Sequence, residues 1–416
     1  MLSRRVVVTG LGAITPIGNT LQDYWDGLSN GVSGCALTTQ FDTSKFKTKF
    51  SCEVKNFDPT QFIDKKEARR MDRFTQFAIV STDEAIKDAA FNDTLNKDRV
   101  GVIWGTGIGG LHTFLHEVRE FVKGDGTPRF SPFFIPMMIG DISAGMVSIR
   151  HGYRGPNFVT VAACASSSNA IADAFNYIRL NKADVIVTGG SEACVNEAAI
   201  GGFNAMKALS ERNDDPATAS RPFDLDRDGF VLGEGAGALI LEEYEHAKAR
   251  GAKIYCEIMG CGLSADAYHM TAPHPEGLGA TNVMKYALED AGMKPEDIDY
   301  VNVHGTSTPL GDPQEIKAIM SVFGDHAYKM NISSTKSMTG HLLGGAGAVE
   351  TIACILALHK GIVPPTINHF TDDPAFDPAL NLTFNKAQHR EVNAAISNTF
   401  GFGGHNASVI VKKFAE

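Results

Sequence analysis

Val100-Gly-Val-Ile-Trp-Gly-Thr-Gly107 has a counterpart later in the chain, Tyr300-Val-Asn-Val-His-Gly-Thr-Ser307. Both stretches are apolar enough to be buried strands. Each follows an amphipathic helix with a similar end, Asp88-Ala-Ala90 in one case and Asp290-Ala-Gly292 in the other. The sequence therefore predicts an internal duplication.

Two more pairs occur in the same order. Residues 5–10 and 253–258 are predicted to open the halves as strands, and residues 230–241 and 400–411 to close them as glycine-rich hairpins. Strands that alternate with helices favour an α/β fold with buried sheets. We expect two similar halves, 1–250 and 251–416, the first enlarged by an insertion at about 108–150 that is rich in Phe, Pro and Met.

Composition narrows the class of protein. The chain has 416 residues, 43% of them hydrophobic and 21% charged, as is usual for a globular protein. A net charge of −10 gives no general attraction for nucleic acid or anionic lipid, so neither partner is expected. The most apolar helix, near 345–358, is predicted to be well short of a membrane span.

The cysteines and the start of the chain bear on location. The seven cysteines are scattered and have no CxxC or Cys/His ligand spacing, so neither disulfides nor a zinc site is indicated. The first apolar run is too short for a signal peptide and leads directly into a strand. We expect a cytoplasmic protein with reduced thiols.

Cys164 stands at a predicted strand-to-helix turn, after Asn157-Phe-Val-Thr-Val-Ala-Ala163 and before Ala165-Ser-Ser-Ser168. The free N–H groups and the dipole at a helix start favour thiolate, and small neighbours admit a substrate. A small buried hydrophobe is the other common role of a free cysteine. Taken alone, this turn leaves the two interpretations equal.

One glycine-rich motif and one acidic motif suggest ligand sites that their sequence context argues against. Gly105-Thr-Gly-Ile-Gly-Gly110 satisfies GxGxxG, but Asp125 lies in a Gly-Asp-Gly-Thr-Pro loop and not at the end of a second strand, which argues against a dinucleotide site. Asp224-Leu-Asp-Arg-Asp-Gly229 resembles half of an EF-hand loop, but position 235 is glycine where a bidentate acid is required.

Two histidines decide the interpretation of Cys164. His304 opens a polar loop after a buried strand, and His341 begins a helix that the duplication pairs with the Cys164 helix. The two helix starts are therefore expected to face one pocket. With Lys336, Asp312 and Glu315 near them in sequence, these groups are the parts of covalent acyl transfer.

The chain resembles the 3-oxoacyl-(acyl-carrier-protein) synthases, condensing enzymes of the thiolase superfamily, and among their subtypes it looks most like synthase II, which elongates long acyl chains. The resemblance covers the whole chain. It lies in Ala163-Cys-Ala-Ser-Ser167, 221–237, His304-Gly-Thr-Ser-Thr308, Lys336-Ser-Met-Thr-Gly-His341 and 398–406. It implies a duplicated five-layer αβαβα fold with two mixed sheets, and a homodimer.

The resemblance also implies a mechanism. Cys164 accepts the acyl group, with the backbone N–H groups of Cys164 and Phe402 as an oxyanion hole and Phe402 as a gate. Malonyl-carrier protein then loses carbon dioxide, and His304 and His341 stabilise the enolate. Lys336 orients His341 and biases the local field.

Further residues take roles from the same resemblance. Asp312, Glu315 and Glu350 support the loops, Thr306 and Thr308 bind the phosphopantetheine arm, and Ile108, Phe203 and Phe400 line the acyl pocket. No organic cofactor is expected. A monovalent cation at Asn302, Glu350, Ser397 and Asn398 and a polar network without metal are both open interpretations.

The carrier protein, as an acidic partner, needs a basic landing site on an acidic enzyme. Lys65-Lys-Glu-Ala-Arg69-Arg70-Met-Asp-Arg73 places five positive charges on one predicted helix. A solvated helix face is the usual meaning of such a run. With an acidic partner, Lys65, Lys66, Arg69 and Arg70, together with Lys207, are predicted to dock it.

The alternatives are a polyketide-type ketosynthase, a coenzyme A-dependent thiolase, a non-catalytic chain-length factor and, weakest, an oxidoreductase. A thiolase carries a late catalytic cysteine, but the last cysteine here is Cys354. A chain-length factor lacks the nucleophile that Cys164 provides. The serines of Ala-Cys-Ala-Ser-Ser-Ser168 replace residues common in relatives, which makes acyl preference harder to assign.

Overall fold

The computed structural model describes residues 4–415, and its two halves have the same strand order. The first half contributes β5 (Asn157–Thr160), β4 (Val100–Gly105), β6 (Val185–Glu192), β7 (Gly235–Glu243) and β1 (Val6–Ile14). The second contributes β10 (Asn331–Ser333), β9 (Tyr300–Asn302), β13 (Ala394–Gly401), β14 (His405–Lys412) and β8 (Cys256–Ala265). Each half-sheet is mixed, as expected.

The two half-sheets meet at their inner edges. β1 pairs with β8 over three residue pairs, which makes one ten-stranded sheet of the two five-stranded halves. Two small two-stranded sheets lie outside it, β2 (Ala36–Leu37) with β3 (Phe50–Ser51) and β11 (Ile362–Val363) with β12 (Gln388–His389).

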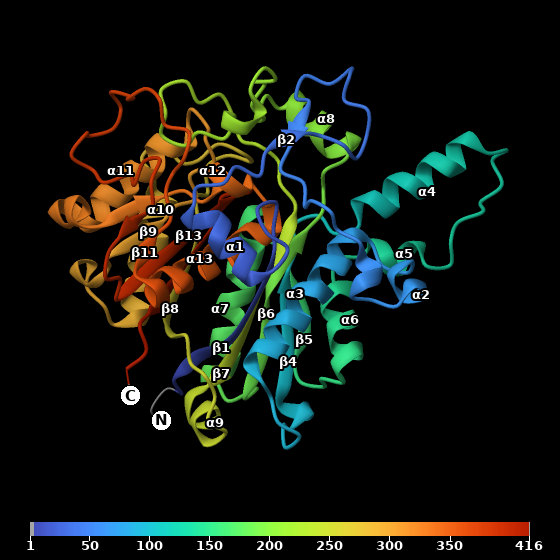
Figure 1. Ribbon diagram of the computed structural model, residues 1–416, viewed down its shortest axis with the longest axis horizontal. Helices are drawn as coiled ribbons and strands as arrows, with labels where there is room; N and C mark the ends of the chain where they lie inside the picture. Colours follow the sequence, from blue (N-terminus) through green and yellow to red (C-terminus); the bar gives the residue numbers. More distant parts are fainter. Residues whose placement is uncertain (1–3, 416) are drawn as a thin grey trace.

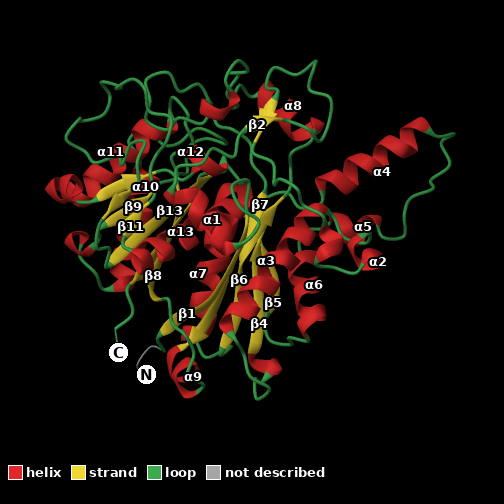
Figure 2. Ribbon diagram, viewed as in Figure 1, coloured by secondary structure: helices red, strands yellow, loops and turns green. Residues whose placement is uncertain are grey.

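Helices form the other three layers (Figure 1, Figure 2). The central layer is α7 (Ser166–Arg179) and α13 (Ala346–Lys360), which touch each other and strands of both halves. One outer layer contains α3 (Arg73–Ala89) and α6 (Ile142–His151), and the other α10 (Leu278–Ala291) and α11 (Gly311–Phe323). This is the five-layer α/β arrangement that the family resemblance implied, with the two mixed sheets joined edge to edge through β1 and β8.

Glycines let the outer helices approach the sheet in the same way in both halves. A Cβ on Gly12 of β1 would lie 2.1 Å from the Ser81 oxygen of α3. A Cβ on Gly262 of β8 would lie 2.0 Å from the Val283 oxygen of α10. Neither position accepts a side chain, so close helix–sheet packing is a shared property of the two halves.

The remaining helices lie around this frame. They are α1 (Leu21–Ser29), α2 (Lys65–Ala68), α4 (Leu111–Lys123), α5 (Phe134–Met138), α8 (Glu197–Ala205), α9 (Tyr244–Ala249) and α12 (Lys336–Thr339). The expected insertion at 108–150 contains α4, α5 and most of α6, and α4 projects from the body of the molecule (Figure 1).

One of the two predicted hairpins is wrong. Residues 400–411 do form a hairpin, in which β13 and β14 are joined by a tight turn. Residues 230–241 do not, because β7 pairs with β6, whose last residue is Glu192, and a long segment with α8 connects them. The first half therefore has a second insertion, at 193–234, where the other half has three residues.

The most apolar helix is a core helix. Residues 343–360 meet the length and composition of a membrane span, contrary to the expectation of a clear shortfall, but 89% of that stretch is buried inside the protein. It packs in the largest hydrophobic cluster, between the two half-sheets.

Candidate active site

Cys164 lies in a short 3-10 turn, Ala163–Ala165, between the end of β5 and the start of α7, as the sequence predicted. Ala163 has a φ of +49°, which an alanine rarely adopts. The strain aims the next side chain into a cavity instead of along the sheet. The thiol is almost completely buried, with Cys164 only 7% exposed.

The duplicated turn in the other half carries His341. The chain passes from α12 through Gly340 to His341 and then through the turn Leu343–Gly345 into α13. Leu343 has a φ of +46°, which repeats the strained turn at Ala163. The two helix starts meet, and His341 Nε2 lies 3.0 Å from Cys164 Sγ.

A second imidazole completes the group. The His304 ring lies 5.3 Å from the His341 ring, nearly perpendicular to it, and 5.6 Å from the Phe400 ring. Phe230 packs edge-on against His341 at 5.4 Å. The sequence prediction that Cys164, His304 and His341 share one pocket is confirmed.

The thiol is not pre-ionised, contrary to the sequence-based expectation. Burial raises the pKa of Cys164 to about 12, because the thiolate would lose its hydration. The Lys336 charge and the backbone N–H groups of Phe402 and Cys164 lower that pKa, but by less. These N–H groups therefore lie beside the sulfur, within reach of the oxygen of a thioester carbonyl bonded to it, but they do not make a stable thiolate.

Both imidazoles are neutral near pH 7. Burial and then the Lys336 charge hold the pKa of His341 well below its usual value. The same two causes, with His341 third, depress the pKa of His304. The Nδ1 atoms of His304 and His341 are buried without a partner among residues 4–415, so Nε2 is the nitrogen that each ring presents for chemistry.

Lys336 is anchored on Glu350. Its Nζ donates to Glu350 Oε1 inside the core, where both residues are buried. Burial raises the pKa of Glu350 to about 7, against the effect of Lys336. Lys336 thus acts on the two imidazoles through its charge.

Glu315 and Asp312 hold the loop that carries His304. Glu315 accepts the backbone N–H groups of His304 and Gly305, each at 2.8 Å. Asp312 accepts those of Ser307 and Phe223 at 3.1 and 3.0 Å. Burial raises the pKa of Glu315 to about 7 and that of Asp312 to about 6. Both acids have the supporting position that the sequence indicated.

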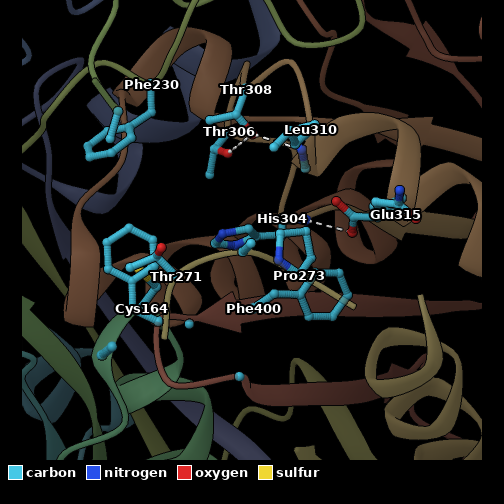
Figure 3. A pocket seen from close by; sticks show the side chains of 18 of the residues that line it. Cys164, Phe230, Thr271, Pro273, His304, Thr306, Thr308, Leu310, Glu315 and Phe400 are labelled. Carbon is cyan, nitrogen blue, oxygen red and sulfur yellow. Dashed lines mark hydrogen bonds between the residues drawn. The ribbon is translucent and has the colours of Figure 1, made fainter. Parts of the chain in front are cut away.

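The three reactive groups open into a cavity of about 410 Å³ (Figure 3). Thr306 and Thr308 line it, with their hydroxyl oxygens 3.3 Å apart. The remaining predicted lining residues are also present: Ile108, Phe203, Phe400 and Phe402.

Two of the predicted acyl-pocket residues, Phe203 and Phe400, pack in different hydrophobic clusters. Phe203 belongs to an apolar cluster with Leu111 and Phe230. Phe400 packs with His304 and with the cluster beneath α10 and α11. No motif in the sequence indicated this division of the wall.

Three buried oxygens lack partners beside the Lys336–Glu350 pair. Within residues 4–415, Asn302 Oδ1, Glu350 Oε2 and Ser397 Oγ make no hydrogen bond. Ser397 pairs with Asn302 between adjacent strands β13 and β9. Asn398 differs, since its Oδ1 accepts the Ser408 hydroxyl at 2.7 Å. Uncharged and anionic oxygens left unpaired together fit a hard cation.

The basic segment is divided between two helices, so the prediction of one helix is wrong. Lys65 and Lys66 lie on α2, Arg69 and Arg70 on the turn after it, and all four are exposed. Arg73 begins α3 and turns inward, where it binds the buried Glu234 at 2.8 Å. Lys207 is exposed directly after Met206 of the cavity wall.

Sequence reasoning missed three features. Phe230 lines the cavity, although only its place in a glycine-rich motif marked it. Residues 271–274 also line the cavity from a loop with no motif. Glu192 is fully buried at the end of β6, and a lone acid after Gly-Gly at the end of an apolar strand was its only signal.

Family models match both halves of the chain. The "Beta-ketoacyl synthase, N-terminal domain" matches residues 3–247, and the "Beta-ketoacyl synthase, C-terminal domain" residues 255–370.

Individual proteins are similar over the full length. The chain is 53% identical to 3-oxoacyl-[acyl-carrier-protein] synthase 2 of Synechocystis sp., over 99% of this chain and 98% of the relative. It is 50% identical to the protein of the same name from Staphylococcus aureus, over 99% of both. The ketosynthase of a type II polyketide synthase, solved in complex with its acyl-carrier protein, is 32% identical with a TM-score of 0.89 and covers 99% of this chain and 100% of its own. With its nucleophile, two imidazoles and duplicated fold in place, the chain belongs to the beta-ketoacyl synthase family.

Proposed function

We propose that this protein is an elongating 3-oxoacyl-(acyl-carrier-protein) synthase of type II, which condenses malonyl-carrier protein with a Cys164-bound acyl chain. The observation that carries the proposal is the meeting of Cys164 Sγ and His341 Nε2 at 3.0 Å, with His304 beside them in one cavity. These are the groups that decarboxylative Claisen condensation requires.

In the first half-reaction the acyl group moves to the enzyme. The Cys164 sulfur attacks the acyl thioester, and the carbonyl oxygen develops negative charge toward the N–H groups of Cys164 and Phe402. The thiol proton passes to His341 Nε2, its nearest acceptor, and then to the departing pantetheine sulfur. An acyl-enzyme and free carrier-protein thiol result.

In the second half-reaction the malonyl thioester loses carbon dioxide. The neutral His341 ring first moves its proton from Nδ1 to Nε2 by exchange with solvent. The electron pair of the broken C–C bond then becomes an enolate, whose oxygen accepts hydrogen bonds from the Nε2–H groups of His304 and His341. The carbanion attacks the acyl carbonyl carbon, and the C–S bond to Cys164 breaks. One proton from solvent restores the thiol and balances the reaction.

Fatty-acid elongation is favoured over a polyketide route by degree of similarity. The two synthase 2 relatives are 53% and 50% identical, against 32% for the polyketide ketosynthase. A chain-length factor is disfavoured because Cys164 is intact. The seven free thiols suit a reducing cytoplasm, where we place the reaction.

Acyl-carrier protein is the substrate-bearing partner. The polyketide ketosynthase is named as a complex with such a protein. In this chain Lys65, Lys66, Arg69 and Arg70 are exposed, and so is Lys207, which directly follows Met206 of the cavity wall. Because the chain has a net charge of −10, these local cations are the attractive surface for an acidic carrier.

The enzyme acts as a homodimer, with the projecting insertion as contact surface. The insertion exposes large apolar side chains on α4, α5 and the loop between them: Phe114, Val118, Phe121, Val122, Phe130, Phe133 and Ile135. Val122 alone is 74% exposed. Sedimentation should give a dimer for the native chain and a monomer for Val122→Asp, while a dimer unaffected by Val122→Asp contradicts the assigned surface.

A monovalent cation is held by Asn302, Glu350, Ser397 and Asn398, supported by the three unpartnered oxygens. The ion would satisfy the three unpartnered oxygens, while Lys336 pairs with the other oxygen of Glu350. Replacing potassium or sodium with tetramethylammonium should lower the melting temperature. Ser397→Ala should remove that dependence, and equal melting in all three salts contradicts a bound ion.

Acylation without malonyl donor tests the function. The protein is mixed with saturated acyl-carrier proteins of graded length and analysed by intact mass and peptide mapping. One adduct, on Cys164, is expected in the native protein and in a control, Cys354→Ala, that removes another buried thiol. Cys164→Ala should give none. An unmodified native protein at every length overturns the proposal.

A further inference from the structure

Glu192 is a fully buried carboxylate that the mechanism above does not use. It ends β6, opposite Gly235 of β7, behind the cavity wall. Gly107, Ile108 and Leu343 line the cavity, whereas Glu192 does not. A buried carboxylate is costly unless its oxygens are satisfied, so its partners show what it holds.

The partners of Glu192 come from two separate turns. Oε1 accepts the backbone N–H groups of Ile108 and Gly109, each at 3.2 Å, and the Thr106 hydroxyl at 3.1 Å. Oε2 accepts the backbone N–H groups of Gly107 at 2.8 Å and Gly344 at 3.0 Å. Four backbone N–H groups thus converge on one side chain.

These bonds connect the two halves at the floor of the site. Gly107–Gly109 belongs to the first half and includes Ile108 of the acyl pocket, while Gly344 is three residues after His341. The turns touch so closely that a Cβ on Gly344 would lie 2.2 Å from the Gly107 nitrogen. Nothing larger than glycine fits between the carboxylate and either turn.

The turn that Glu192 holds forms one side of the cavity, through Gly107 and Ile108. Ile108 is 45% exposed, and its backbone N–H is bonded to Glu192. Its neighbours on both sides are glycines, which have no side chains to hold the turn in place. Glycine neighbours give the turn many alternative conformations once its hydrogen bonds are lost. The carboxylate is therefore what keeps Ile108 at a fixed depth in the pocket.

We propose that Glu192 is a positioning residue that fixes the Gly107–Gly109 turn, and with it Ile108, and so limits the length of acyl chain that Cys164 accepts. The inference rests on the proposed function, since it concerns acylation of Cys164. Glu192 itself touches no substrate.

Two variants test this role. Glu192→Gln keeps the size but turns an NH₂ group toward one of the two sets of N–H donors, which releases part of the turn. Thr106→Val removes only the hydroxyl donor to Oε1 and keeps the charge. Both should raise the ratio of long-chain to short-chain acylation rates, by about three- to tenfold for Glu192→Gln and less for Thr106→Val.

A charge readout separates positioning from general damage. Negative Glu192 raises the pKa of the Cys164 thiol, after burial. Glu192→Gln should therefore shift the pH dependence of Cys164 alkylation to lower pH, whereas Thr106→Val should leave it unchanged. A variant that is merely less stable does not produce this difference.

The chain supplies matched controls at the other end of β6. Glu242 is also fully buried, opposite Val185, and accepts the Thr9 hydroxyl at 2.8 Å. β6 has eight residues, so the position of Glu192 and the position opposite Glu242 are about 23 Å apart along the strand. Glu242→Gln, which also weakens the ion pair of Glu242 with Arg250, and Thr9→Val should both lose stability and keep the native length profile.

The outcomes are distinct. No acylation of the native protein overturns the proposed function, whatever the variants do. If the native protein acylates and both site variants keep its length profile, the role of Glu192 is refuted. If Glu192→Gln does not fold, Thr106→Val alone decides, and a profile equal to that of Thr9→Val refutes the inference.

Discussion

At the scale of single residues, the environment of Cys164 combines a strained turn with a setting that opposes ionisation. Its pKa is about 12, because burial outweighs the Lys336 charge and two backbone N–H groups. Such a nucleophile is activated only when a thioester arrives and its proton has an acceptor, here His341 Nε2 at 3.0 Å. The acyl-enzyme then forms although the resting enzyme carries no thiolate, the form of cysteine that is prone to oxidation.

The thiol pKa gives a direct prediction. Alkylation of Cys164 by iodoacetamide should accelerate about tenfold per pH unit between about pH 7 and pH 10, since the thiolate fraction grows in that proportion below a pKa of about 12. Peptide mapping isolates the Cys164 rate, and Cys164→Ser gives the background. A plateau near neutral pH would mean a stable thiolate–imidazolium pair.

The pKa values of the two imidazoles determine how the rate of malonyl decarboxylation falls at acid pH. Both must be neutral, and burial with the Lys336 charge keeps each pKa well below its usual value, so activity should persist to pH values well under 6.5. Lys336→Met removes the positive charge, which raises both pKa values and moves the acid limb to higher pH. Lys360→Met, exposed at the end of α13, is the control. Acid limbs at the same pH in the native protein and in Lys336→Met would contradict the effect of the Lys336 charge on the imidazoles.

At the scale of elements, α3 and α10 end in the same left-handed conformation with different residues. Ala90 follows α3 at a φ of +50°, and Gly292 follows α10 at +61°. Alanine is strained there and glycine is not. The two halves share this backbone conformation, but only the second has the residue that suits it.

Exchanging these two residues should have opposite effects. Ala90→Gly should stabilise the protein by about 1 kcal/mol, and Gly292→Ala should destabilise it by a similar amount. Both positions are exposed, and no atom lies within 4 Å of a Cβ on Gly292, so packing contributes little. Denaturant unfolding measures both, and a loss of stability in Ala90→Gly would contradict the argument.

At the scale of the whole molecule, the central helix layer joins the halves. α13 touches β13 of its own half and β7 of the other, within one hydrophobic cluster. Ile352 of α13 is fully buried in that cluster. Unfolding of one half therefore exposes apolar surface of the other, so the halves are expected to unfold together.

Calorimetry can test this coupling. Ile352→Ala should cost about 2–5 kcal/mol and move a single transition to lower temperature. Leu180→Ala, at a site 66% exposed, should change stability by less than about 0.5 kcal/mol. Two separate transitions in the native protein or in Ile352→Ala would show that the halves are independent.

Local patterns in the sequence were enough for the elements that recur in both halves and for the turn at Cys164. Features that depend on contacts between residues far apart in the chain could not be predicted from these local patterns. Arg73 looked like a surface cation until Glu234, 161 residues away, was placed beside it. The thiol pKa depends on burial by several segments, and Glu192 binds turns 85 and 152 residues away in sequence.

The paired turns at Ala163 and Leu343 constrain how such a catalyst can originate. In an assembly of two identical single-copy subunits, any substitution appears in both turns, so a thiol in one place is a thiol in both. Once the coding sequence has been duplicated, one turn can keep the nucleophile while the other acquires the imidazole. Here that difference is Cys164 against His341, in contact at 3.0 Å. Duplication of the coding sequence is therefore a precondition of this chemistry, and a split of this chain between its halves would have to yield two dissimilar, mutually dependent products.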